Sequence, residues 1–197
     1  MNAKTFWRNF KDKIYGNEEL KKDWNNTKEF TNSIIEKLEN DVIKESEENK
    51  ENDDVKTERE YFRIDLISYR NLHKNNDFLI GKLQNCSWDL ITAVEHENDY
   101  RLWFDEVVKL AHVSCPLRVV IGYLPKSAQH DKYIKKVSDA LKKIEAWNNT
   151  KNIGEFMIII GNCKLKSSDE EGKCVYRPYV YDKEKEDFIV PEWANES

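Results

Sequence analysis

Three acidic side chains have the types and spacing that best suit metal binding or acid–base catalysis: Asp65, Glu95 and Glu97. Glu95 and Glu97 are two positions apart in an extended segment, so their side chains leave the backbone on the same side. Two like charges at the end of an apolar strand repel each other and lose hydration. A cation bound between them would offset both costs, so the pattern predicts a metal site.

The segments around these acids alternate between apolar and polar residues, as strands do. Residues 60–67 place Phe62 and Leu66 on one face and Asp65, near the end of the segment, on the other. Residues 88–97 form a second strand, which ends on the two glutamates. If the two strands pair, three carboxylates converge, and such hard oxygen ligands suit Mg²⁺ or Mn²⁺.

A less specific interpretation of the second strand stays open. Residues 95–99 could form a solvated loop whose Asn98 or Asp99 side chain caps the following helix. Charged residues are common at the surface, so spacing alone does not decide between the two interpretations. His96 alternates away from the glutamates, and we expect a buried, hydrogen-bonded histidine there rather than a general base.

The remaining segments predict a layered α/β fold. Helical spacing of apolar residues predicts helices, and short apolar or alternating runs predict strands. The helices are expected at 5–15, 27–46, 99–112 and 130–147, and the further strands at 117–124, 156–160, 175–181 and 187–190. We therefore predict a mixed central β-sheet flanked by helices, with extra N-terminal helices and a C-terminal β-hairpin.

The domain organisation follows from the length and from shifts in composition. A chain of 197 residues is expected to form a single domain over residues 1–197. Residues 1–46 hold the N-terminal helices, 47–58 form an acidic flexible loop with almost no apolar side chain, and 59–197 form the α/β core.

Composition restricts the class of protein. The 32 basic and 37 acidic residues give a net charge of −5, which argues against a passive nucleic-acid-coating role. No apolar run approaches the roughly 20 residues of a spanning helix, so no membrane partner is expected. The N-terminus lacks the apolar stretch of a signal peptide, and the four cysteines form no Cys-x-x-Cys pair. These features predict a cytoplasmic protein with free thiols.

Three stretches of the sequence resemble the PD-(D/E)xK, or restriction-endonuclease-like, nuclease superfamily. They are Arg63-Ile-Asp65-Leu-Ile, then Trp88-Asp-Leu-Ile-Thr-Ala-Val-Glu95-His-Glu97-Asn98, and, after a helix with Trp103 and Lys109, Leu117-Arg-Val-Val-Ile-Gly-Tyr. The family core is a helix, a strand with an Asp, a strand with (D/E)-x-K, a helix and a further strand. The resemblance covers about residues 30–124 in element order and implies a restriction-endonuclease-like core.

The resemblance implies phosphodiester hydrolysis by a Mg²⁺- or Mn²⁺-dependent endonuclease. Asp65 matches the family's metal-binding Asp, and Glu95 matches its second acidic ligand. The lysine position holds Glu97, which would ligate metal or accept the proton of the attacking water. Some restriction enzymes have a second glutamate there. Other members take the lysine from the following helix, where Lys109 could stabilise charge on the phosphate.

Two parts of the expected site have several candidates. The family's acidic residue on the first core helix could be Glu29, Glu36 or Glu39. Phosphate contacts are predicted from lysines on and just before helix 130–147, although a lysine-rich composition also produces ordinary solvated helix faces. These lysines are Lys126, Lys132, Lys135 and Lys136.

The expected partner is nucleic acid, DNA ahead of RNA, and a homodimer is a possible assembly. Two other classes of function stay open. The first is a catalytically inactive member of the same fold that binds protein or nucleic acid as an accessory factor, which the missing lysine and the acidic charge favour. The second is a small immunity or antitoxin-type protein whose carboxylates face a basic partner. Whether the carboxylates of Asp65, Glu95 and Glu97 meet separates these classes from an enzyme.

Overall fold

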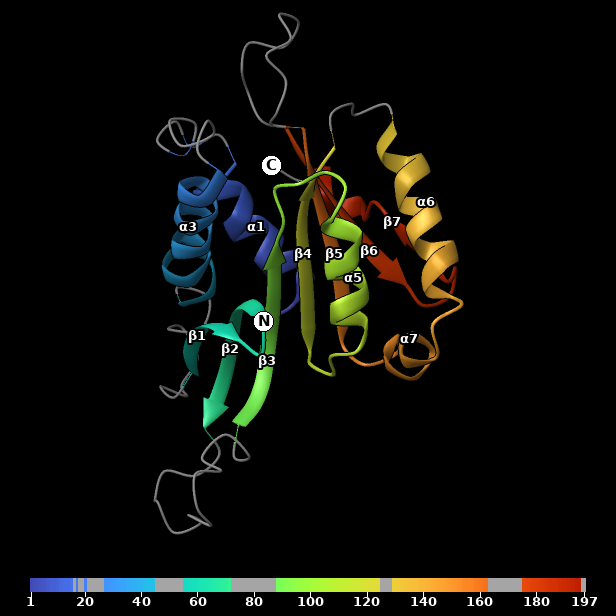
Figure 1. Cartoon of the computed structure of the whole chain (residues 1–197), viewed down its shortest axis with the longest axis horizontal. Helices are drawn as coiled ribbons and strands as arrows, with labels where there is room; N and C mark the ends of the chain where they lie inside the picture. The colour runs from blue at the N-terminus through green and yellow to red at the C-terminus, as the bar shows by residue number, and fades with distance from the viewer. Residues whose placement is uncertain are drawn as a thin grey trace, which may run out of the picture.

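The computed structural model describes residues 1–15, 17, 20, 27–44, 55–71, 88–124, 129–162 and 175–195. In these ranges the chain forms a seven-stranded mixed sheet with helices on both faces (Figure 1). The predicted α/β class, with a mixed central sheet between helices, is therefore confirmed.

The strands lie side by side in the order in which they occur along the chain. They are β1 (Val55–Tyr61), β2 (Ile64–Asn71), β3 (Trp88–His96), β4 (Leu117–Tyr123), β5 (Glu155–Gly161), β6 (Tyr176–Asp182) and β7 (Asp187–Ile189). The central strands β3, β4 and β5 are parallel, whereas β1 and β2 on one side and β6 and β7 on the other pair antiparallel. The predicted C-terminal hairpin is formed by β6 and β7.

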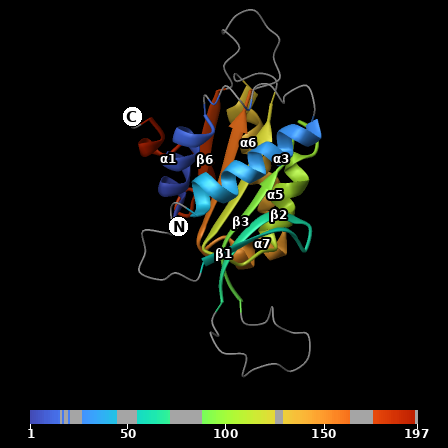
Figure 2. The same ribbon diagram turned by 90° about the vertical axis from the view of Figure 1, so that its left-hand side faces the viewer.

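Helices cover both faces of this sheet. One face carries α1 (Ala3–Lys13) and α3 (Thr27–Lys37), which continues as the π-helix η2 (Leu38–Lys44) (Figure 2). The other face carries α5 (Trp103–Ala111), α6 (His130–Leu141) and α7 (Glu145–Thr150), and a 3₁₀ helix, η5 (Glu192–Asn195), follows β7. The expected helix 130–147 is thus two helices. In the described part of the chain, no helix has the length and apolar character needed to cross a bilayer.

The buried strands are those whose sequences are mostly apolar, and β4 also buries one charged residue, Arg118. Every residue of β4 is buried, as are Phe156–Gly161 of β5, because helices pack on both faces of these central strands. The side chains alternate between two cores: Val119 and Ile121 face α1 and α3, whereas Val120 faces α5. The two cores therefore place α3 and α5 on opposite faces of the strand that carries Glu95.

The prediction for residues 55–63 was wrong. The acidic loop was expected to continue to residue 58, but residues 55–58 belong to β1; residues 47–54 lie outside the described residues. β1 is an edge strand whose charged side chains are largely exposed, so it has no buried face to produce an apolar alternation.

The strand expected over 60–67 is likewise two strands joined by a tight turn. Tyr61 pairs with Ile64, so Phe62 and Arg63 form a two-residue turn between β1 and β2. Both turn residues have positive φ, at 48° and 64°. Such turns normally contain Asn or Gly. Because this turn contains neither residue, it was not predicted from the sequence. As a consequence, Asp65 is the second residue of β2 rather than the end of a strand.

Helix α5 lies unusually close to β4 at Gly122. A Cβ atom at this position would lie 2.7 Å from Cβ and 2.8 Å from Cγ of Trp103, which is the first residue of α5. Because Trp103 is only 3 % exposed, neighbouring side chains leave it little room to move. Glycine at position 122 therefore sets the distance between the helix and the sheet.

We expect Gly122→Ala to destabilise the protein by about 1–3 kcal/mol, the usual cost of overpacking a core. The double variant Gly122→Ala with Trp103→Phe should not recover the loss, because phenylalanine keeps the Cβ and Cγ atoms that the new methyl group meets. Urea unfolding measures both effects. A Gly122→Ala variant as stable as the wild type would show that α5 can shift without cost.

Candidate functional site

Asp65 and Glu95 meet on neighbouring strands, at the face that α5 covers. The register that pairs Leu66 with Val94 places Asp65 beside Glu95. Asp65 is half-buried, and its Oδ2 accepts a hydrogen bond from the backbone N–H of His96 at 2.8 Å. The Glu95 side chain is 1 % exposed. Two of the three carboxylates predicted to converge are therefore neighbours in a largely buried position.

Lys109 reaches this pair of acids from α5. Its Nζ lies 2.9 Å from Oε1 of Glu95, forms a second ion pair with Glu106 and donates a hydrogen bond to the Arg63 carbonyl oxygen at 2.9 Å. Glu106 and Lys109 are three positions apart on α5, so both side chains lie on one side of the helix. We call Asp65, Glu95, Glu106 and Lys109 the acid–lysine cluster.

The cluster contains more acid than its single lysine can neutralise. Burial raises the pKa of Glu95 to about 9; Lys109 opposes this shift, and the charges of Asp65 and Glu106 add to it. The pKa of Asp65 is also raised, first by burial and then by the charge of Glu60, against the hydrogen bond from His96.

The pKa of Glu95 is raised overall, because loss of hydration and two neighbouring acids outweigh the ammonium group that Glu95 shares with Glu106. Partial burial acts to lower the pKa of Lys109, but its contacts with Glu106 and Glu95 raise it. Glu95 therefore holds a proton more readily than an ordinary glutamate, while Lys109 stays charged.

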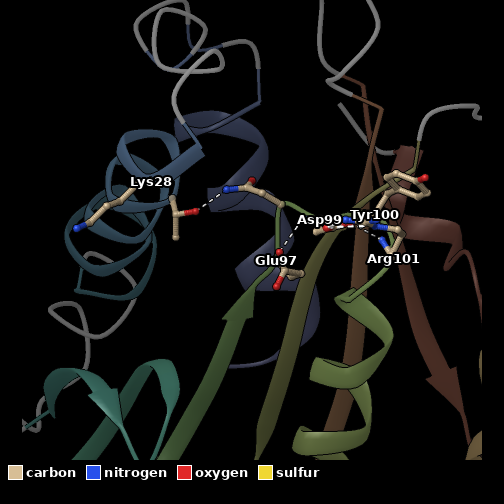
Figure 3. A pocket seen from close by; sticks show the side chains of 7 residues that line it. Lys28, Glu97, Asp99, Tyr100 and Arg101 are labelled. Carbon is tan, nitrogen blue, oxygen red and sulfur yellow. Dashed lines mark hydrogen bonds and ion pairs between the residues drawn. The ribbon is translucent and has the colours of Figure 1, made fainter.

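Glu97 does not join the cluster. β3 ends at His96, and the charged groups that act on Glu95 are Asp65, Glu106 and Lys109 rather than Glu97. The Glu97 Oε1 atom accepts a hydrogen bond from the Asp99 backbone N–H at 2.6 Å (Figure 3). Glu97 lines a pocket of about 530 Å³ whose other walls include Lys28 of α3 and Arg101.

The expected convergence of Asp65, Glu95 and Glu97 is thus limited to the first two acids. Among the residues that the structure describes, no three His, Cys, Asp or Glu side chains are arranged as a metal-binding group. Lys109 lies against Glu95, where such a group would place a cation.

None of the three candidates for the acid on the first core helix lies in the cluster. Glu39 is tied to β1, where its carboxylate binds Arg59 at 2.7 Å and accepts a hydrogen bond from Thr57. Glu29 and Glu36 are exposed on α3, which packs on the opposite face of the sheet from α5. Glu106 of α5 is the acid that joins the cluster. Its spacing of three residues from Lys109 was the available sequence signal.

The interpretation of residues 95–99 as a solvated loop that caps the next helix is wrong. None of these residues is exposed, and Asn98 is buried with its Nδ2 donating a hydrogen bond to Thr31 Oγ1. The N-cap residue of α5 is Leu102, and no described side chain caps this helix. Asp99 accepts a hydrogen bond from the Arg101 backbone N–H at 2.9 Å in the turn before α5.

His96 is buried as expected, and its Nε2 lies 2.9 Å from the Tyr123 hydroxyl group. Burial lowers the pKa of His96 to about 3, which keeps the ring neutral.

The lysines predicted to contact phosphate have different environments. Lys132 and Lys136 are exposed on α6, and the Nζ of Lys136 lies 5.5 Å from the Tyr133 ring centroid. Lys135 is also exposed, but it pairs with Asp187 at 2.8 Å and with Asp139. Lys126 lies outside the described residues. Lys132 and Lys136 are thus exposed and form no ion pair with another described residue.

Comparison with known proteins does not assign a family, because no protein-family model, curated protein or solved structure matches this chain. The sequence and the geometry of the acid–lysine cluster are therefore the two indications of function.

Glu95 should cause the folded protein to lose stability as the pH rises. Its pKa is raised from 4.5 to about 9 on folding, so the folded state keeps a proton that the unfolded chain releases. This contribution is fully present below pH 4.5 and is lost as the pH rises toward 9. We expect the melting temperature of Glu95→Gln, which cannot ionise, to fall less than that of the wild type between about pH 7 and pH 9.

The interval lies above the ordinary pKa of histidine, 6.5, so titration of His96 does not contribute to it. Glu97→Gln is the matched control, because it removes a carboxylate that lies partly exposed outside the cluster, and it should follow the wild type. Equally steep curves for Glu95→Gln and the wild type would show that Glu95 is ionised in the folded protein.

Proposed function

We propose that this protein is a Mg²⁺- or Mn²⁺-dependent nuclease that hydrolyses phosphodiester bonds of DNA or RNA. The observation that carries the proposal is the position of Lys109: from the helix after β3, its ammonium group reaches Glu95, which lies beside Asp65. The resemblance implies a particular set of groups for a nuclease that lacks the lysine on the strand. This set is two acids on adjacent strands and a lysine from the following helix.

The order of the elements supports the same proposal. Helix α3 is followed by β2 with Asp65, β3 with Glu95, α5 with Lys109, and β4. This is the order of the restriction-endonuclease-like core, with β1 inserted between the first helix and the Asp-bearing strand. The restriction-endonuclease-like core itself is part of the proposal.

In the proposed reaction, Asp65 and Glu95 would hold the divalent cation, which would supply activation of water and polarisation of the scissile phosphate. To hold the cation, Glu95 would give up its contact with Lys109 and release any proton that it holds. The displaced ammonium group can then stabilise the negative charge that develops on the phosphate. Water oxygen would bond to phosphorus as the bond to the leaving sugar oxygen breaks. Glu106, which pairs with Lys109, would accept the water proton, and solvent water would protonate the leaving sugar oxygen.

The alternative proposal is a catalytically inactive member of this fold that binds protein or nucleic acid, as an accessory, immunity or antitoxin-type factor. The observation that favours it is the pairing of Lys109 with Glu95, Glu106 and the Arg63 carbonyl oxygen. If this arrangement persists in the presence of divalent cations, the cluster is a structural ion-pair network.

Metal binding and cleavage test the proposal directly. At a hundredfold excess over Kd, Mn²⁺ or Mg²⁺ should raise the melting temperature by roughly 5–10 °C. Asp65→Asn should abolish the shift, because it removes a ligand. Glu95→Gln should lower cleavage by roughly 10²-fold or more, since the metal stabilises transition-state charge. Nicking of supercoiled plasmid and degradation of single-stranded RNA measure the activity.

Lys109→Met separates the nuclease from the inactive alternative. It should lower cleavage by roughly 10²-fold or more and leave the metal-induced melting shift unchanged or larger, because the competing ammonium group is gone. Lys143→Met, at an exposed lysine that follows α6 and is not among the proposed phosphate contacts, is the control for loss of one positive charge. A wild type that shows neither a melting shift nor cleavage with any divalent ion would contradict the nuclease proposal.

The basic face of α6 should contribute unequally to nucleic-acid binding. Lys132→Ala and Lys136→Ala should each reduce the slope of log affinity against log salt by about one unit. Lys135→Ala should reduce it less, because Lys135 already neutralises Asp187. Fluorescence anisotropy at several salt concentrations measures the slopes. Unchanged slopes for Lys132→Ala and Lys136→Ala would show that this face does not contact phosphate.

A further inference from the structure

The turn between β1 and β2 adopts a backbone conformation that its residues disfavour. Phe62 and Arg63 have φ values of 48° and 64°, and Glu60, just before them, has a φ of 57°. Positive φ brings Cβ too close to the following carbonyl oxygen, so Gly and Asn are the residues that usually occupy such turns. A bulky aromatic residue and an arginine therefore occupy positions that smaller residues would fill more easily.

Packing does not account for the choice of Phe62. Its side chain is 79 % exposed, more than any other large hydrophobic side chain in the described part of the protein. Its ring contacts Tyr61 edge to face, with centroids 4.6 Å apart and planes at 86°. One face-edge contact leaves most of the ring open to solvent. Phe62 thus combines a strained backbone conformation with an exposed apolar ring. Strained residues of this kind cluster at functional sites.

The turn adjoins the acid–lysine cluster. The carbonyl oxygen of Arg63 accepts the hydrogen bond from Lys109, and Asp65 follows two residues later. Lys109 in turn contacts Glu95. A molecule that reaches these acids therefore meets the ring of Phe62 and the exposed side chain of Arg63 nearby.

We infer that the Phe62–Arg63 turn binds a strand of nucleic acid beside the acid–lysine cluster, with Phe62 stacked on a base and Arg63 paired with a phosphate. The inference rests on the proposed function for the identity of the ligand. An exposed aromatic ring next to an arginine is the combination that stacks bases and holds the backbone in single-strand binding sites.

The inference also names the class of substrate. A ring at the tip of a turn needs an accessible face of a base, which single strands, ends and opened duplexes offer and a continuous duplex does not. Single-stranded or locally opened nucleic acid is therefore the substrate that this turn selects.

Phe62→Asn is the decisive variant. Asn tolerates positive φ better than Phe, so the melting temperature should stay the same or rise, and loss of fold cannot explain a loss of binding. The probe is a single-stranded DNA oligonucleotide with 2-aminopurine, measured in chelator so that cleavage does not interfere. We expect Phe62→Asn to bind about 10-fold or more weakly and to lose the quenching of 2-aminopurine, as deletion of one stacked base contact does.

Two further variants make the test specific. Arg63→Asn, which is also suited to positive φ, should weaken binding and reduce its salt dependence by about one phosphate contact. Ile153→Asn is the control, since it removes another exposed apolar side chain, 41 % exposed, from the end of the sheet where β5 begins. It should bind like the wild type.

The outcomes separate this inference from the nuclease proposal. Weaker binding by Phe62→Asn without cleavage in any metal would support the inference and contradict the nuclease. Wild-type affinity in Phe62→Asn would overturn the inference even if the protein cleaves. A wild type that binds no nucleic acid, and whose self-association or vesicle binding disappears in Phe62→Asn, would overturn it in favour of a protein or membrane contact.

Discussion

The buried carboxyl group of Glu95 is the constraint on which this part of the structure depends. An ionised group withdrawn from water loses hydration worth several kcal/mol in a real protein, so it must find a partner or keep a proton. Lys109 supplies the partner at 2.9 Å, and the same ammonium group binds the Arg63 carbonyl oxygen. One lysine thus connects the end of β3, helix α5 and the β1–β2 turn, and its reach fixes how these three elements are placed.

The acid–lysine cluster contains more acidic than basic groups, and this excess distinguishes it from the other ion pairs. Three acids lie around one lysine, so the arrangement is short of positive charge. A purely structural ion pair would match the charges more closely, as the pairing of Glu39 with Arg59 and Lys44 does at the far side of the sheet. The excess of acid is the physical basis for treating this cluster, rather than the other ion pairs, as the site.

The elements predicted correctly from the sequence are those in which buried apolar residues recur at regular spacing. β4 and α5 were predicted because burial imposes an apolar run on one and a helical period on the other. β1 was not predicted, because this edge strand has no buried face that would produce an alternation of apolar and polar residues. Glu97 was assigned to the site because the strand was extended past its end at His96. Glu106 was missed because its spacing of three residues from Lys109 was not used, although that spacing puts both side chains on one side of α5.

The close contact at Gly122 has a mechanical consequence for the cluster. Trp103, which presses on Gly122, begins α5, and Lys109 follows six residues later, or about 9 Å along the helix axis. A change in the distance between Trp103 and Gly122 would tilt α5 against the sheet. The tilt would change the distance between the Lys109 ammonium group and the Glu95 carboxylate. Position 122 therefore offers a way to tune the spacing between lysine and carboxylate while every residue of the cluster stays in place.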